Sequence, residues 1–221
     1  LDGTKLFVPD ANVADYLHVA ALKPDGSFGA FVIAREQEGV EISMLKTIGS
    51  DKQAEVVLNN VKVNNQDCIE IDQSQAGRLA NMAISLECSY LVGLAQKDFE
   101  IAIDYAKERV QFGRPIGSFQ AIQHKAADMI TDVDGMRFIT YKAAWATSEN
   151  DDSQDMDVAM AKAWCSDASR RVVAHGQQIH GGIGFTKDYI IQLYFRRQKR
   201  AELFWGDADF HRERVAQMLE I

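Results

Sequence analysis

The sequence predicts an α+β protein in which a partial β-barrel or sheet domain, residues 1–73, precedes a C-terminal four-helix bundle, residues 74–221. Two observations support this prediction. Up to about residue 73, apolar residues occur in short runs separated by turn residues, which is typical of strands. After Ser74 the apolar residues recur at helical spacing, and the pattern stays helical to the end of the chain.

Five strands are predicted in the first region. Each is a run of apolar residues bounded by turn signals, and Pro24-Asp25-Gly26 is typical of a turn between two of them. The predicted strands are residues 5–8, 16–22, 28–34, 40–45 and 54–63. Residues 64–75 are polar and have no clear period, so we expect them to form a linker.

The first predicted helix is long and ends near Val110. Leu79, Met82, Leu86 and Tyr90 follow one another at helical spacing, so they lie near one face of this helix. Two glycines and a proline then interrupt the pattern, which indicates a turn. These breaking residues are Gly113, Pro115 and Gly117.

Further helices follow this turn. Ser118 is predicted to be the N-cap of the second helix, which ends in the polar residues 150–153. A third, alanine-rich helix is stopped by the glycines of residues 181–184. Two shorter helices are predicted at about residues 189–204 and 209–219.

The composition limits the possible functions. The chain is 47% hydrophobic and 25% charged, as in an ordinary globular protein. Its net charge of −8 argues against nucleic-acid binding, which needs a positive field. No apolar run is long enough to cross a bilayer and no signal peptide is present, so we expect no membrane insertion. The three cysteines lack paired or metal-type spacing, which favours a cytoplasmic location without a metal site.

Several residues could bind a nucleotide cofactor. Residues 181–184 contain three glycines at a helix end, and glycine lets a backbone with free N–H groups approach a ligand closely. Arg109 lies beside a helix break and could bind phosphate, while Gln120 and Gln178 can both donate and accept hydrogen bonds. However, such glycines also serve as a C-cap, and such an arginine also meets the helix dipole. Both interpretations stay open on local pattern alone.

A basic cluster in the fourth helix is similarly open. It is a solvated helix face or it faces a phosphate group, and the sequence pattern favours neither. The cluster consists of Arg196, Arg197, Lys199 and Arg200.

Longer motifs resemble the acyl-CoA dehydrogenase family of flavoproteins. They are residues 92–96 (VGLAQ), 108–113 (ERVQFG), 118–123 (SFQAIQ) and 178–185 (QIHGGIGF). These motifs occur in the family's order, and the resemblance extends over essentially the whole chain. It implies an N-terminal helical domain that this chain lacks, and because the chain opens at Leu1 without methionine, we expect it to be a fragment.

The resemblance also implies the cofactor and its contacts. The cofactor would be FAD, bound where C-terminal domains pair across a dimer interface. By position, the FAD contacts within one subunit would be Arg109, Gln111, Phe112 and Gln120. The contacts to the FAD of a neighbouring subunit would be Gln178, Gly181 and Gly182.

The usual catalytic base is missing from both positions where the family places it. Members of the family carry a glutamate in a loop that here contains Trp205, or on the first long helix at the position of Ala83. An indole is a donor only and cannot accept the α-proton of the substrate. The catalytic base is therefore unknown. The carboxylates that could replace it, each more typical of a surface or capping role, are Glu87, Glu202 and Asp207.

Four functions are compatible with these residues. The resemblance implies α,β-desaturation of an acyl-CoA thioester, either by this chain with another base or by a heteromeric enzyme in which this chain is the base-lacking subunit. A flavin-dependent monooxygenase of the same fold needs no such base, and a non-catalytic scaffold needs no chemistry. The implied partners are an acyl-CoA substrate, an electron-transfer flavoprotein as electron acceptor, and other subunits in a homo- or hetero-oligomer, a dimer or tetramer.

Overall fold

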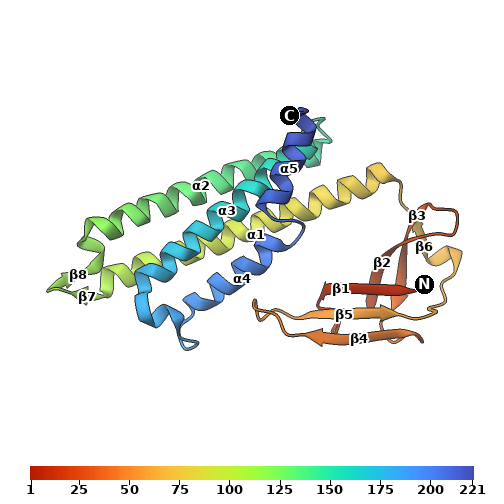
Figure 1. Ribbon diagram of the computed structural model, residues 1–221, viewed down its shortest axis with the longest axis horizontal. Coiled ribbons are helices and arrows are strands. Elements are labelled where there is room, and N and C mark those ends of the chain that lie inside the picture. Colours follow the sequence, from red (N-terminus) through yellow and green to blue (C-terminus); the bar gives the residue numbers. More distant parts are fainter. The chain divides into compact units, whose positions relative to one another are not determined.

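The computed structural model describes residues 1–221 except for the side chain of Asn65. It confirms an α+β fold, with strands in the first third of the chain and a helical bundle after it (Figure 1). By internal contacts the chain divides into two compact units, Leu1–Leu79 and Ala80–Ile221. This division lies in the first turns of a helix, so the domain boundary between residues 73 and 74 stays a prediction.

The first unit contains two small antiparallel sheets with the strand orders β1-β5-β4 and β2-β3-β6. Their strands are β1 (Gly3–Pro9), β2 (Tyr16–Leu22), β3 (Phe28–Ala34), β4 (Val40–Leu45), β5 (Gln53–Leu58) and β6 (Cys68–Glu70). Alternate residues of β2 are buried, including Leu17 and Val19, because successive side chains of a strand point to opposite faces. They pack with Val56 of β5 in one apolar core.

Two predictions in this unit were wrong. The fifth strand ends at Leu58, not at residue 63, because Asn60 has a positive φ of 52° and turns the chain. The predicted linker contains β6, which pairs with β3 and places Cys68 opposite Phe31. This pairing depends on a partner distant in sequence, which explains why the local pattern did not reveal it.

The second unit is built on five α-helices. In Figure 1 the shorter α4 and α5 follow the long helices of the bundle. They are α1 (Gln73–Glu108), α2 (Gln120–Glu149), α3 (Gln154–His180), α4 (Ile191–Leu203) and α5 (Ala208–Leu219). Helix α3 is central and contacts α2, α4 and α5. Several of its alanines, among them Ala161 and Ala168, are fully buried and allow neighbouring helices to approach closely.

The predicted apolar face of α1 is not its buried face. Leu86 is 70% exposed and Met82 is 47% exposed, whereas Cys88, Leu91 and Ala95 belong to the core. The buried face carries small and polar residues as well as apolar ones, so apolar spacing alone indicated the wrong side of the helix.

The predicted N-cap of α2 was also wrong. The capping position is Phe119, and the Ser118 hydroxyl instead donates a hydrogen bond of 2.7 Å to the carbonyl of Pro115. Ser118 belongs to a 3₁₀ turn, Ile116–Ser118, that precedes the helix and shifts its start by one residue.

The α1–α3 contact contains a buried acid, Asp98. Its side chain is fully buried, and neither carboxyl oxygen has a hydrogen-bond partner among the described residues. Gly176 of α3 leaves the space for it, because a Cβ atom at that position would overlap the Asp98 carboxylate. Burial raises the pKa of Asp98 to about 8, because the charged form is poorly solvated there.

Among the described residues, no helix combines the length and the apolar character that a membrane span requires.

Candidate functional site

The residues predicted to contact FAD lie at one end of the helical bundle. Tyr105 in the last turn of α1 stacks on His180 at the end of α3, with ring centroids 4.3 Å apart. Arg109 follows Tyr105 closely in sequence, and Gly181 follows His180 directly. The α1–α2 connection and the glycine turn are therefore neighbours at this end (Figure 1).

A tight hairpin carries the first group. Strands β7 (Val110–Gln111) and β8 (Arg114–Pro115) pair through a two-residue turn at Phe112 and Gly113, whose φ angles are 53° and 78°. Two positive φ angles in succession are typical of the hairpin turn that matches strand twist. The turn leaves Phe112 93% exposed, with its ring edge-on to that of Phe119.

The polar groups at this end have few partners within the chain. The Arg109 guanidinium is exposed and has no partner among the described residues. The Gln111 amide donates only to the adjacent carbonyl of Val110. Gln120 and Gln178 are both exposed.

The glycines of the second group provide open backbone. Gly181 ends α3 with a positive φ of 61°, and its N–H is directed at the carbonyls of Gln177 and Gln178. A Cβ atom at Gly181 or Gly182 would meet nothing within 4 Å, so a ligand could approach this backbone closely. A free cation, side-chain amide donors and glycine backbone that a ligand can approach, all at one end, fit a phosphate-bearing cofactor. That these residues contact FAD stays a prediction.

The loop expected to carry the catalytic base joins α4 to α5. Trp205 has a left-handed φ of 63° and is 45% exposed, with its ring edge-on to Phe204. Gly206 follows with a φ of 92°, and a Cβ atom there would overlap the ring of Phe210. The loop geometry therefore requires glycine at 206, and the side chain at 205 cannot accept a proton.

The other base positions hold no uncommitted carboxylate. Ala83 lies on α1 and has no titratable group. Glu87 accepts a hydrogen bond of 2.8 Å from Arg200. Glu202 is buried and paired with Lys199 at 2.9 Å. Asp207 caps α5 by accepting from the Phe210 N–H at 2.9 Å.

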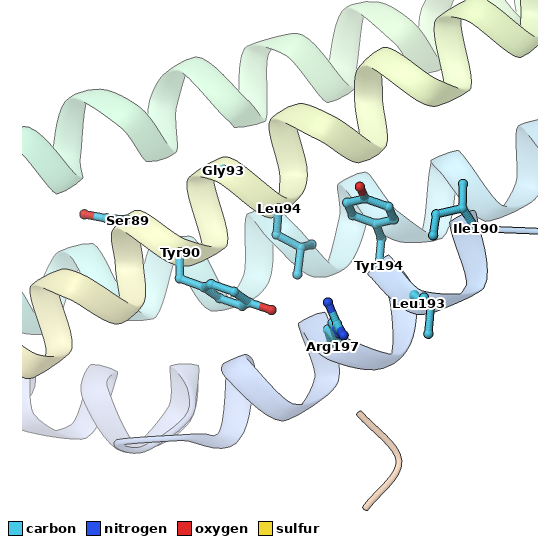
Figure 2. A pocket seen from close by; sticks show the side chains of 8 residues that line it. All are labelled: Ser89, Tyr90, Gly93, Leu94, Ile190, Leu193, Tyr194 and Arg197. Carbon is cyan, nitrogen blue, oxygen red and sulfur yellow. The ribbon is translucent and has the colours of Figure 1, made fainter. Parts of the chain in front are cut away.

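The basic cluster of α4 is largely paired within the chain. Arg196 donates to Gln192 at 2.9 Å, and Lys199 and Arg200 pair with the carboxylates named above. Arg197 instead lines a cavity of about 340 Å³ between α1 and α4 (Figure 2). Most of the cluster therefore stabilises the helix surface rather than forming one phosphate site.

The sequence patterns did not predict this cavity. Figure 2 shows that the Tyr90 and Tyr194 rings and the Arg197 side chain come from two helices and line the same space. From the sequence, Tyr90 is placed only on one face of the first long helix, and in the structure this residue is 43% exposed. No sequence pattern marked Tyr194, and Arg197 was marked only as a member of the basic cluster. The cavity depends on how α4 packs on α1, which local patterns do not reveal. The full lining is Ser89, Tyr90, Gly93, Leu94, Ile190, Leu193, Tyr194 and Arg197.

Comparison with known proteins gives consistent results. A family model described as the acyl-CoA dehydrogenase C-terminal domain matches residues 71–220. Acyl-CoA dehydrogenase FadE27 of Mycobacterium tuberculosis is 30% identical over 226 residues, which are 99% of this chain and 60% of that protein.

Two solved structures are similar over the same extent. The crystal structure of the ChsE4–ChsE5 complex from Mycobacterium tuberculosis matches with a TM-score of 0.93 and 32% identity, over 100% of this chain and 59% of that one. The Tcur3481–Tcur3483 steroid ACAD G363A variant matches with a TM-score of 0.89 and 29% identity, over 99% of this chain and 59% of that one. The chain thus spans about three fifths of the length of these relatives. The family model, which matches more than half of the chain, shows that the chain belongs to the acyl-CoA dehydrogenase family.

Proposed function

We propose that this chain is the base-lacking subunit of a heteromeric acyl-CoA dehydrogenase. The observation that carries the proposal is Trp205, an indole in the loop where the family places its glutamate, together with Ala83 at the alternative position. Members of the family are FAD-dependent oxidoreductases that act on acyl-CoA thioesters. A glutamate-bearing partner subunit would supply the base that this chain lacks.

The chemistry assigns separate tasks to the two subunits. Desaturation removes a proton from the α-carbon and a hydride from the β-carbon of the thioester, and FAD supplies the hydride-accepting chemistry when bound. This chain would bind the cofactor through Arg109 and the glycine turn and leave proton abstraction to the partner. The proposal takes an electron-transfer flavoprotein as the final acceptor.

Two similarities support a heteromeric assembly and a bulky substrate. Both solved structures described above are named as pairs of different chains, and one of them is named a steroid ACAD. A steroid-type CoA thioester is therefore the substrate class that we propose for the assembled enzyme.

The proposal is tested with the full-length protein, alone and mixed with a glutamate-bearing relative. We expect flavin bleaching by a steroid-type CoA thioester only in the mixture. Bleaching by the protein alone would contradict the proposal and indicate another base. Oxygen consumption with supplied reduced flavin would indicate a monooxygenase, and no flavin binding in any mixture would indicate a scaffold.

Trp205→Glu in the full-length protein is expected to restore proton abstraction. With a carboxylate in the loop, exchange of the α-proton of a bound acyl-CoA with deuterated solvent should rise by about 100-fold, the lower end of the range for general-base catalysis. Mass spectrometry of the recovered thioester measures this exchange. Trp205→Gln is the control, because glutamine has the shape of glutamate but cannot act as a base. Equal exchange in both variants with intact ligand binding would show that position 205 does not face the substrate.

Arg109→Gln is expected to weaken FAD binding about tenfold, because a charge-assisted contact with phosphate is lost. Equilibrium titration of the full-length apoprotein, followed by flavin fluorescence, measures the affinity. Arg114→Gln is the matched control, since Arg114 lies on the same hairpin but stacks over the Phe119 ring at 4.1 Å. Similar affinities for the Arg109 variant and the wild type would remove Arg109 from the cofactor site.

A further inference from the structure

A buried lysine lies beneath the α4–α5 loop. Lys162 of α3 has no exposed surface, and its Nζ atom lies 2.8 Å from the carbonyl oxygens of both Glu202 and Gly206. The Ser166 hydroxyl at 3.0 Å and the Ala201 carbonyl at 3.3 Å complete its surroundings. An ammonium group has three donors, so all of them have acceptors here.

The acceptors explain why this charge is tolerated. Ala201 and Glu202 are in the last turn of α4, where helix carbonyls lack intrahelical partners and the helix dipole is negative. The carboxylate of Glu202 faces elsewhere, toward Lys199, Arg170 and Gln198. Lys162 therefore binds main-chain dipoles rather than a carboxylate, and its bonds reach from the helix end to Gly206.

A second basic residue holds the same loop from α5. His211 is fully buried, and its Nε2 lies 2.8 Å from the carbonyl oxygen of Trp205. Burial lowers the pKa of His211 to about 4, so the ring is neutral at pH 7 and Nε2 is the nitrogen that donates. Lys162 and His211 thus bind the two consecutive carbonyls of Trp205 and Gly206.

These two carbonyls belong to the residues with left-handed backbone. A non-glycine residue such as Trp205 adopts a φ of 63° at an energetic cost, so the surrounding structure has to hold it there. Backbone hydrogen bonds also hold the loop, such as that from the Gly206 N–H to the Leu203 carbonyl at 3.2 Å.

We propose that Lys162 and His211 are positioning residues that fix the backbone at position 205 and so set where its side chain points. Neither side chain touches the proposed substrate; both act through the main chain. The geometry they impose is independent of the side chain at 205, so the same support would hold a glutamate. The consequence for catalysis rests on the proposed function, whereas the positioning itself does not.

The positioning is tested without ligand by ¹⁹F NMR of the full chain labelled with 5-fluorotryptophan. Trp145, Trp164 and Trp205 are assigned by single Trp→Phe substitutions. Lys162→Met removes the charge and donors at similar length and should shift or broaden the Trp205 resonance, leaving that of Trp145 in place. Lys199→Met is the control, because Lys199 is nearby but binds the Glu202 side chain and no loop carbonyl.

His211→Phe provides an independent test if Lys162→Met does not fold, as judged by circular dichroism. It removes only the bond to the Trp205 carbonyl and should displace the same resonance. A Trp205 resonance that keeps its wild-type position and width in either folded variant would overturn the proposal.

The catalytic consequence is measured in the Trp205→Glu protein. Adding Lys162→Met should abolish most of the α-proton exchange gained, and adding Lys199→Met should not. If the Trp205 resonance moves as expected but Trp205→Glu gains no exchange, the positioning stands and the proposed function fails.

Discussion

Asp98→Asn is expected to stabilise the protein at pH 8 and to have little effect near pH 4. The pKa of Asp98 is about 8 in the folded chain and 3.8 without burial, so the folded state holds its proton over this range and the unfolded state does not. The free energy of unfolding of the wild type therefore falls as the pH rises from about 4 to 8 and levels off above. A pKa difference of about four units changes the free energy of unfolding by on the order of 5 kcal/mol.

Urea denaturation at several pH values measures the free energy of unfolding of Asp98→Asn and of the wild type. The asparagine does not titrate, so the gap between variant and wild type should widen steadily up to pH 8. Asp188→Asn is the control, because it makes the same substitution at an exposed carboxyl group. A constant difference between the Asp98 variant and the wild type would show that the carboxyl finds a charged or polar partner.

Gly176→Ala is expected to lower the free energy of unfolding by about 3 kcal/mol, the upper part of the range for overpacking a core. The added methyl group would overlap the Asp98 carboxylate, whose own helix is fixed by the core around it. Thermal or urea unfolding measures the loss. Gly93→Ala is a matched control in mid-helix, where a Cβ atom meets nothing within 4 Å and the alanine should be neutral or slightly stabilising.

The double variant Asp98→Ala/Gly176→Ala separates overlap from other causes. Removing the carboxylate makes room for the methyl group, so the double variant should regain most of the stability lost by Gly176→Ala. The two effects would then be strongly non-additive, as expected for residues in contact. Additive effects would show that the glycine is needed for another reason, such as the path of the α3 backbone.

Much of the fold followed from the sequence because its signals are local. The ranges of β2, β3 and β4 agree with the prediction, since each strand is a short apolar run between turns. The break after α1 was similarly marked by glycine and proline. No local signal marked the buried face of α1, because this face includes Asp98 and Ser85, whose burial depends on the partner helix.

The candidate site was predictable only in part. The family motifs named the residues, and the structure shows that the Arg109 hairpin and the glycine turn lie at the same end of the bundle. The supports of Trp205 could not be predicted. Lys162 lies in an alanine-rich helix far from the loop in sequence, and a lysine there would ordinarily be expected at the surface. Its role depends on carbonyl groups, which every residue has and no motif reveals.

The Asp98–Gly176 contact also restricts the order in which these two positions can diverge. Alanine at 176 lowers the stability while position 98 carries the acid, but it fits once a smaller residue has replaced Asp98. In a lineage, the acid at 98 can therefore be replaced before the glycine at 176, but not after it. Among related chains, we expect an acid at 98 to occur together with glycine at 176, whereas chains with a small residue at 98 are free to vary at 176.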